Sequence, residues 1–147
     1  MKFSTTFRYG ARAVAQLAAT HPKRPVSVCE VGQKQGISPK YLEHILQALK
    51  AAGVVQAVHG KRGGYVLARL PASITLKDLY EDLIGALAPS HCSAKPDRCP
   101  MRDVCPVWDT WIELKDAVEK VLERTTVQDL VERVKRKATP SEPMYCI

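Results

Sequence analysis

The sequence predicts a mostly α-helical chain with one small β-hairpin, followed by a long helix near its end. Three observations lead to this fold class. Apolar residues recur at helical spacing through most of the 147 residues, a β-branched stretch with three glycines interrupts them at residues 54–68, and a heptad-like apolar pattern follows at 107–121. With 46% hydrophobic residues the chain can build a core. No apolar run approaches the roughly 18 residues that would span a membrane.

Two helices are expected at the start of the chain. The first has an apolar stripe over about residues 3–20. The second begins at Ser27, whose hydroxyl can cap free backbone N–H groups, continues to about Gln35, and is closed by Gly36. Cys29 falls within this second helix, and we expect it to be a small buried hydrophobic side chain.

A third helix, over about residues 38–51, has two opposed faces. Ser38 can cap it, and Pro39 suits the first helical position because its φ is preset and it has no N–H to satisfy. Four apolar residues form one face: Leu42, Ile45, Leu46 and Leu49. Four polar residues form the other face: Lys40, Glu43, His44 and Gln47. Residues 27–51 therefore predict a helix, a tight turn at glycine, and a second helix.

The β-hairpin is expected immediately afterwards, from strands at residues 54–58 and 65–68. Between them lie the residues that we call the wing tip: His59, Gly60, Lys61, Arg62, Gly63 and Gly64. Glycines allow a backbone to turn tightly and to approach another surface closely. Adjacent Lys and Arg at a hairpin tip suit a phosphate backbone or a minor groove. A helix–turn–helix followed by a basic, glycine-rich hairpin predicts a winged helix-turn-helix.

The charge is divided unevenly along the chain. Residues 1–74 carry 11 Lys and Arg and two acidic residues, which gives a net charge of +9. Residues 75–147 carry 11 Lys and Arg and 13 acidic residues, which gives a net charge of −2. The two halves together make the net charge of +7 of the whole chain. A basic half that also carries a capped helix is the electrostatic pattern of a protein that binds a polyanion.

Thr75 and Asp78 form a start similar to a capping box for a fourth helix, to about residue 84. A Pro-rich loop over residues 87–106 then carries three cysteines: Cys92, Cys99 and Cys105. The chain starts without an apolar signal segment, so we expect a cytoplasmic protein with reduced thiols. Three thiols at this spacing leave open an iron–sulfur cluster with a fourth ligand from elsewhere, a zinc ion, or a redox-responsive thiol group.

From residue 107 a long helix is expected, and its apolar residues follow 4-3-4-3 spacing: Val107, Trp111, Leu114, Val118 and Val121. Heptad spacing with a charged outer face suits a partner helix, so this helix is expected to join two subunits. A short helix capped at Thr126 should end near Lys137. The expected organisation is a winged helix-turn-helix domain at 1–86, the cysteine loop at 87–106, the dimerisation and terminal helices at 107–137, and a flexible tail at 138–147.

Over about residues 1–135, the chain resembles the IscR/NsrR/RirA family of bacterial winged-helix transcription regulators. The resemblance lies in four features that occur in this order: the basic helix–turn–helix, the wing tip followed by Tyr65, the three-cysteine loop and the long helix. The resemblance implies a cytoplasmic homodimer that binds palindromic promoter DNA. It also implies that the loop cysteines hold a [2Fe–2S] or [4Fe–4S] cluster whose state or presence sets the affinity for DNA.

Carried over by position, Cys92, Cys99 and Cys105 match the cluster cysteines of this family. The base-reading face of its recognition helix is matched by Lys40, Tyr41, Glu43 and His44, and its wing is matched by His59 and the residues after it, including Gly63. From their chemistry, Lys40, His44 and Gln47 suit base edges or nearby phosphates, and Glu43 suits the cytosine N4 donor. Ser38, Lys61 and Arg62 suit phosphates.

The sequence departs from the family where a fourth cluster ligand is expected. The position three residues after the last cysteine, a histidine in some members, is Trp108 here, and the position of an early carboxylate in others is near Arg8. Arginine has no acceptor atom for iron. His91, Cys29, Cys146, a small thiol or water are the substitutes. Members without a cluster exist, so a thiol- or metabolite-responsive regulator of the same fold is the alternative.

Two other classes of protein compete with a DNA-binding regulator. A redox enzyme or electron carrier would use the cysteines, but the sequence has neither a glycine-rich cofactor fingerprint nor a nucleophile–base pair, so no enzyme is expected. A winged helix that contacts protein instead of DNA would show weak, salt-independent DNA binding.

Overall fold

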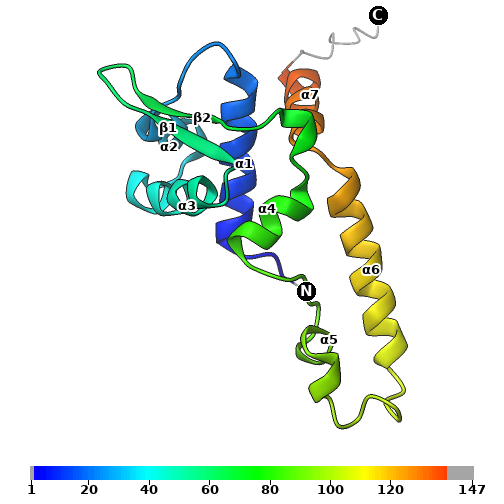
Figure 1. Ribbon diagram of the computed structural model, residues 1–147. Helices are drawn as coiled ribbons and strands as arrows, with labels where there is room; N and C mark the ends of the chain where they lie inside the picture. The colour runs from blue at the N-terminus through cyan, green and yellow to red at the C-terminus, as the bar shows by residue number, and fades with distance from the viewer. Residues whose placement is uncertain (1, 139–147) are drawn as a thin grey trace, which may run out of the picture.

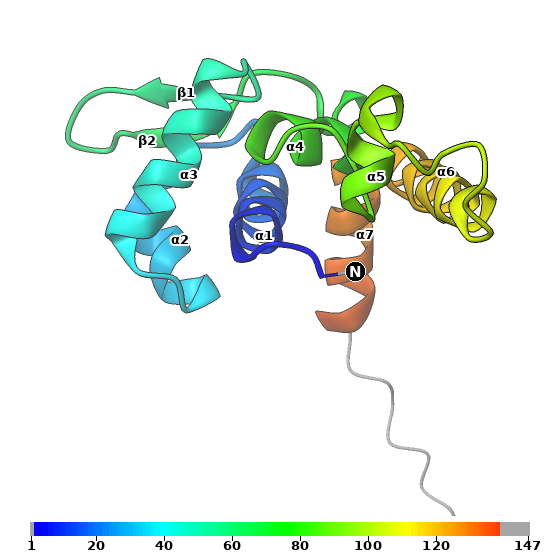
Figure 2. The same ribbon diagram turned by 90° about the horizontal axis from the view of Figure 1, so that it is seen from below.

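Three helices build the first half of the fold, which the computed structural model describes over residues 2–138 (Figure 1). They are α1 (Thr5–Thr20), α2 (Val28–Gln35) and α3 (Pro39–Ala51). Viewed along α1, as in Figure 2, α2 and α3 lie on one side of it and α7 lies on the other. The expected fold class is confirmed: the described residues are mostly helical and contain one two-stranded antiparallel sheet.

The turn between α2 and α3 follows the sequence closely. Ser27 caps α2 by accepting the Glu30 N–H at 3.1 Å, and Ser38 caps α3 by accepting the Tyr41 N–H at 3.3 Å. Gly36 ends α2 with φ of +64°, a left-handed conformation that any side chain would strain. The two helices therefore meet at a fixed angle, as a helix–turn–helix requires.

The hairpin pairs β1 (Val55–Val58) with β2 (Gly64–Leu67) in antiparallel register, from Val55 opposite Leu67 to Val58 opposite Gly64. The connection between α1 and α2 adds a third backbone segment to it. Val26 donates its N–H to the Tyr65 carbonyl at 3.0 Å and accepts the Tyr65 N–H at 2.8 Å. The α1–α2 connection is thus tied directly to the hairpin, a contact that the sequence did not predict.

The core lies between α1, α3, α4 and the hairpin, with α7 closing the far side of α1. Its largest fully buried side chains include the whole apolar face expected for α3: Leu42, Ile45, Leu46 and Leu49. Leucine and isoleucine burial of this extent stabilises the fold by about 1.5–3 kcal/mol per side chain relative to exposure. The outer face of α3 is left for other contacts.

The second half of the chain leaves this body and returns to it. After the short η1 (Pro71–Ser73) comes α4 (Leu76–Leu83), and α6 (Trp108–Arg124) leads back from the far end of the molecule to α7 (Val127–Ala138), which packs on α1 (Figure 1). The Leu76 N–H bonds the Thr125 carbonyl at 2.9 Å, and the Val127 N–H bonds the Ile74 carbonyl at 2.8 Å. These two bonds attach the junction of α6 and α7 to the body.

The cysteine loop contains more structure than its sequence indicated. It includes the one-turn helix α5 (His91–Ala94) and the 3₁₀ turn η2 (Pro96–Arg98). A capping box between Ser90 and Ser93 starts α5. One turn is too short for a helical apolar period to appear in the sequence, which is why only a loop was expected.

One expectation needs correction, and the apolar pattern of α6 proves to be divided. The prediction that Cys29 is buried is wrong: the side chain is exposed, because α2 is short and buries only Val31 and Gly32. The heptad-like residues of α6 do not form one continuous contact, since Val118 packs against the core of its own chain whereas Leu114 is 38% and Val121 is 47% exposed. The expected tail, apart from residue 138 at the end of α7, lies outside the described residues, as does Cys146.

Candidate nucleic-acid interface and cysteine loop

The outer face of α3 presents the polar stripe that the sequence predicted. Lys40, Glu43, His44 and Gln47 are all exposed, while the opposite face of the same helix is buried. This face carries cationic, anionic and amide groups within reach of one another along the helix. Such a mixture can accept and donate hydrogen bonds at base edges.

Tyr41 differs from its neighbours because it is held against α1. Its hydroxyl lies 2.7 Å from the Thr6 hydroxyl oxygen, and its ring meets the Tyr9 ring edge-on with centroids 6.0 Å apart. The residue is only half-buried, so part of the ring still faces solvent. These contacts fix the first turn of α3 to α1 and orient its exposed neighbours.

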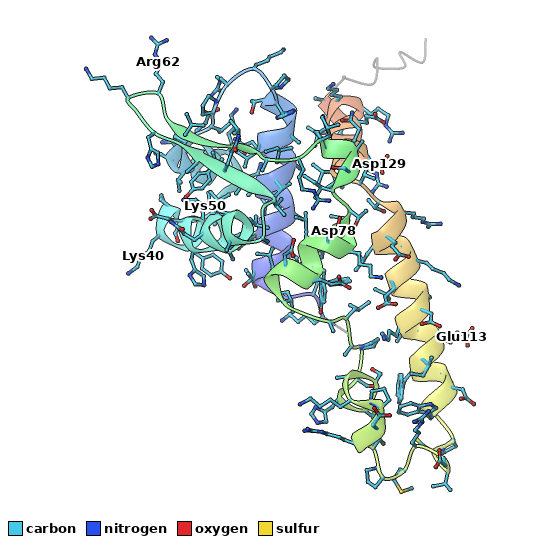
Figure 3. The ribbon with its side chains drawn as sticks, in the orientation of Figure 1. Lys40, Lys50, Arg62, Asp78, Glu113 and Asp129 are labelled. Atoms are coloured by element: carbon cyan, nitrogen blue, oxygen red, sulfur yellow. The ribbon has the colours of Figure 1, made fainter. Side chains whose placement is uncertain are left out.

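The wing tip projects from the body on the same side as the start of α3. Figure 3 shows Lys40 and Arg62 extending on this side, away from α6 and α7, which carry Glu113 and Asp129. His59, Lys61 and Arg62 are exposed. The turn is closed by the Gly63 N–H, which bonds the Gly60 carbonyl at 3.0 Å, and a Cβ at Gly63 would collide with the Val58 carbonyl oxygen.

Two further cationic residues, which the sequence placed only in a loop, lie beside the wing tip. Lys23 and Arg24, in the connection between α1 and α2, line a cleft of about 480 Å³ together with Lys61, Arg62 and Gly63. The adjacent cations at 23 and 24 were visible in the sequence. Their proximity to the wing tip was not, because it depends on the Val26–Tyr65 pairing.

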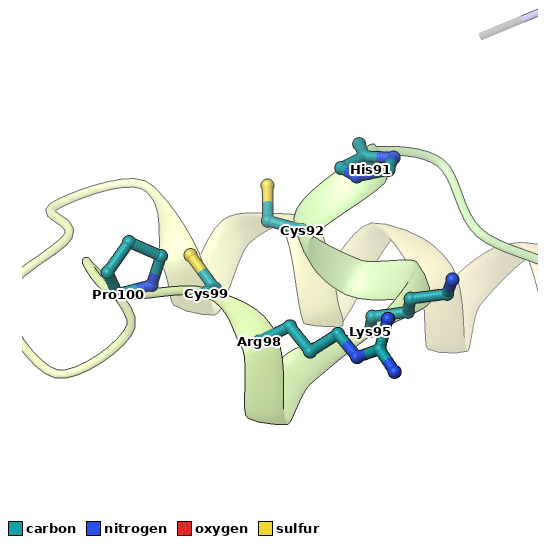
Figure 4. Close-up of a pocket in the computed structure, with 6 residues that line it drawn as sticks. All are labelled: His91, Cys92, Lys95, Arg98, Cys99 and Pro100. Atoms are coloured by element: carbon teal, nitrogen blue, oxygen red, sulfur yellow. The ribbon is translucent and has the colours of Figure 1, made fainter.

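Two of the three loop cysteines share one pocket. Cys92 on α5 and Cys99 after η2 line a cavity of about 310 Å³, and Figure 4 shows both side chains there with the labelled neighbours His91, Lys95, Arg98 and Pro100. The Cys92 thiol donates to the Ser90 hydroxyl oxygen at 3.4 Å. Cys105 is half-buried and does not line this pocket.

The loop fits an iron–sulfur cluster in donor chemistry but not in arrangement. Three thiols on one short segment are suitable cluster ligands. Among residues 2–138, however, no three His, Cys, Asp or Glu side chains are gathered as a metal-binding group. Holding a cluster on all three cysteines would therefore require this loop to rearrange.

The candidate positions for a fourth ligand lie in different places. His91 lines the same pocket as Cys92 and Cys99. The Trp108 ring is covered by the Arg102 guanidinium, 5.8 Å from its centroid, at the start of α6. Arg8 is exposed on α1 and lines a groove against α7, and the exposed Cys29 is on α2. Among these positions in the described chain, His91 alone lines the pocket of Cys92 and Cys99.

No helix within residues 2–138 combines the length and the apolar character needed to cross a membrane.

Comparison with known proteins places most of the described chain in one family. The Rrf2 family model, described as an iron-dependent transcriptional regulator, matches residues 3–133. The HTH-type transcriptional regulator CymR of Bacillus subtilis (strain 168) is 36% identical over 130 residues, which cover 88% of this chain and 89% of CymR.

Solved structures give the same result. The structure of CymR, called the global cysteine regulator of B. subtilis, superposes with a TM-score of 0.76 at 34% identity and covers 90% of this chain and 98% of that chain. The structure of T. potens IscR superposes with a TM-score of 0.80 at 30% identity and covers 99% of this chain and 96% of that chain. The chain belongs to the Rrf2 family of transcriptional regulators.

Proposed function

We propose that this regulator is a cytoplasmic homodimer that binds specific promoter DNA, and that an iron–sulfur cluster on Cys92, Cys99 and Cys105 sets its affinity. The observation that carries the DNA-binding part is the exposed polar face of α3 beside the basic wing tip. Support for the cluster comes from the three thiols on one loop and from the family description as iron-dependent.

In this proposal α3 enters a major groove, and the α3 helices of the two subunits enter successive grooves roughly 34 Å apart. Lys40, His44 and Gln47 contact base edges or adjacent phosphates. An ionised Glu43 accepts from cytosine N4 and disfavours bases that lack a donor at that place. Tyr41, held by Thr6 and Tyr9, keeps this face oriented while its exposed edge meets the backbone.

The remaining DNA contacts in the proposal are to phosphates. Ser38 lies at the N-terminus of α3, where free backbone N–H groups and the helix dipole favour an anion. Lys61 and Arg62 reach the backbone from the wing tip, and Gly63 allows the tight turn that presents them. His59 begins the same turn and is exposed.

The position of the cysteine loop supports a role in regulation. Residues 87–106 lie between α4, which packs on α1 and α3, and α6, which is proposed to join the subunits. When bound, a cluster would supply a centre sensitive to iron supply and redox state. A loop that changes shape would shift α6 relative to the body and with it the spacing of the two α3 helices.

DNA binding is tested by selecting bound duplexes from a random-sequence library and measuring affinity by fluorescence anisotropy. We expect Lys40→Ala to lose about 1–3 kcal/mol of binding free energy for the selected duplex, roughly 5- to 150-fold in Kd. Lys137→Ala, which removes an exposed lysine at the end of α7, is the matched control and should bind as the unmodified protein does. An unchanged affinity in Lys40→Ala would contradict the assignment of α3.

The cluster is tested by anaerobic purification, followed by a visible spectrum and analysis of iron and sulfide. A coloured protein with stoichiometric iron and sulfide, lost in Cys99→Ala and retained in Cys29→Ala, would support the cluster. A colourless protein that stays free of iron and sulfide after reconstitution would rule the cluster out and leave the DNA-binding proposal standing.

A second candidate is a cluster-free regulator that responds through its thiols or a metabolite. The observation that favours it is the shared pocket of Cys92 and Cys99, which excludes Cys105. The relative CymR is named as a cysteine regulator, and a structure of Staphylococcus aureus CymR is of an oxidized form. Thiol titration before and after oxidation, with DNA affinity measured on both samples, distinguishes this candidate from the cluster.

A further inference from the structure

The cleft between the wing tip and the α1–α2 connection gathers four cationic residues, of which the proposed function uses the two on the wing tip. Its wall carries Lys23 and Arg24 from one segment and Lys61 and Arg62 from the other. Within residues 2–138, no salt bridge involves Lys23, Lys61 or Arg62. Three uncompensated positive charges therefore line one cleft, in a chain segment that contains few acidic residues.

The cleft is held in shape by backbone pairing. Val26 exchanges two hydrogen bonds with Tyr65, at 3.0 and 2.8 Å, so the α1–α2 connection follows the hairpin as an additional strand. Gly64 makes this approach possible, since a Cβ there would collide with the carbonyl group of Val26. Lys23 and Arg24 are therefore carried beside the wing tip by rigid structure.

One carboxylate also lines the cleft, and its charge is already neutralised. Glu30 on α2 accepts two hydrogen bonds from the Arg24 guanidinium, at 2.8 and 2.9 Å, and one from Lys34 at 3.3 Å. The Arg24 hydrogen bonds, with smaller contributions from Lys34, lower the pKa of Glu30 to about 2, so this group is ionised at neutral pH. Glu30 thus holds Arg24 and leaves Lys23, Lys61 and Arg62 to attract an anion.

We propose that this cleft binds a backbone phosphate of duplex DNA outside the stretch that α3 contacts, with Lys23 as a ligand from the α1–α2 connection and Lys61 and Arg62 as ligands from the wing tip. This inference rests on the proposed DNA-binding function and extends its contact surface. Glu30 limits the strength of the site, because its carboxylate lines the same cleft and occupies Arg24. The ligand is the phosphodiester itself, so the contact is independent of sequence.

The test uses a mixed-sequence duplex of about 30 base pairs, roughly three helical turns, so that no operator need be known. We expect Lys23→Ala to weaken binding several-fold and to reduce the slope of log K against log salt by about 1 for each subunit bound. Glu30→Gln removes the opposing charge and releases Arg24, and we expect it to bind more tightly and with a steeper salt slope. Lys137→Ala, on α7, is the control of equal charge change outside the cleft.

Phosphate ethylation interference on the duplex selected with the unmodified protein locates the contact. Ethylation of a phosphate on each outer flank should inhibit the unmodified protein, and Lys23→Ala should lose sensitivity at those phosphates only. A merely misfolded variant would instead lose binding as a whole, and its circular dichroism would change. Lys23→Ala with unchanged affinity, slope and ethylation pattern overturns this site while the α3 assignment stands. A protein that binds no duplex overturns both.

Discussion

Short polar side chains cap the starts of six helices in the described part of the chain, α1 to α5 and α7, and each acts over three residues. Ser27 and Ser38 cap α2 and α3 as expected, and the Thr75 hydroxyl and Asp78 carboxylate cap α4 reciprocally. At the start of α7, Asp129 accepts the Thr126 N–H at 2.7 Å, which lowers the pKa of the carboxyl. These contacts were predictable because donor and acceptor are close in the sequence.

Glu30 gives a prediction at the same scale. Its folded-state pKa of about 2 lies below the ordinary value of 4.5, chiefly through the Arg24 hydrogen bonds. A depressed carboxyl pKa contributes stability that is complete above the unfolded pKa and is lost as pH falls through the folded pKa. We therefore expect the free energies of unfolding of the unmodified protein and Glu30→Gln to differ near neutral pH and to converge between about pH 4.5 and 2.

Urea unfolding at a series of pH values measures this convergence. The difference should be modest, because the Arg24 side chain is 52% exposed and solvent screens the pair. Glu43→Gln removes an exposed carboxylate for which no salt bridge is found among the described residues, and it serves as the control. If the free energy of unfolding of Glu30→Gln stays below that of the unmodified protein by the same amount down to a pH of about 2, the ion pair is not the source of the difference.

Among the elements, the hairpin and the α1–α2 connection act as one unit. β1 and β2 form only a two-stranded sheet, and such hairpins are marginally stable alone. The pairing of Val26 with Tyr65 adds backbone hydrogen bonds and anchors β2 to the helical body. The position of the wing tip relative to α3 therefore depends on this contact.

Gly64→Ala tests this dependence. Its Cβ would meet the Val26 carbonyl group, so the hairpin must move outward, and we expect a loss of about 1–3 kcal/mol in the free energy of unfolding from overpacking. Binding to a mixed-sequence duplex should weaken as well, because the wing tip shifts. Thermal unfolding and anisotropy titration measure the two effects.

Gly60→Ala provides the comparison. Gly60 has φ of +119°, but a Cβ added there would meet no atom within 4 Å, so substitution brings backbone strain without collision. If both variants lose equal stability, strain at the turn explains the effect and close packing on Val26 does not.

At the scale of the whole molecule, α6 extends away from the helical body (Figure 1). It leaves apolar side chains exposed to solvent. Val107, Leu114 and Val121 are between 38% and 47% exposed along it. Exposed apolar groups repeated along one helix suit a partner subunit. Since Val118 already packs on the core, the proposed dimer contact uses the part of the heptad pattern that the chain itself leaves uncovered.

Leu114→Glu tests the dimer. A charge at this position would be buried in the proposed contact, and we expect a shift from dimer to monomer in sedimentation or light scattering, with a loss of at least about tenfold in DNA affinity as one subunit's contacts are removed. Leu70→Glu, at a leucine that is 70% exposed outside α6, is the matched control. A Leu114→Glu protein that stays dimeric would exclude this face of α6 as the interface.

The longer helices, the caps of α2, α3 and α4 and the hairpin could be predicted from the amino-acid sequence. These features depend on apolar periodicity and on hydrogen bonds between residues only a few positions apart, so their signals are local. The family followed from a resemblance in the order of the motifs along the chain. The exposed polar face of α3 followed in the same way from its spacing. The one-turn α5 was not predicted because it is shorter than any period, and Cys29 was misplaced because burial depends on the neighbours of a helix as well as on residue type.

Only the folded structure shows which segments that are distant in the sequence contact one another. The fold pairs Val26 with Tyr65 and so brings Lys23 beside Arg62, it divides the apolar residues of α6 between core and solvent, and it groups Cys92 with Cys99 apart from Cys105. Each of these results depends on how segments distant in the sequence pack together. The sequence pattern of each segment by itself is compatible with several ways of packing. The packing of the whole chain selects among those arrangements, because only one of them buries the apolar faces and pairs the backbone groups together.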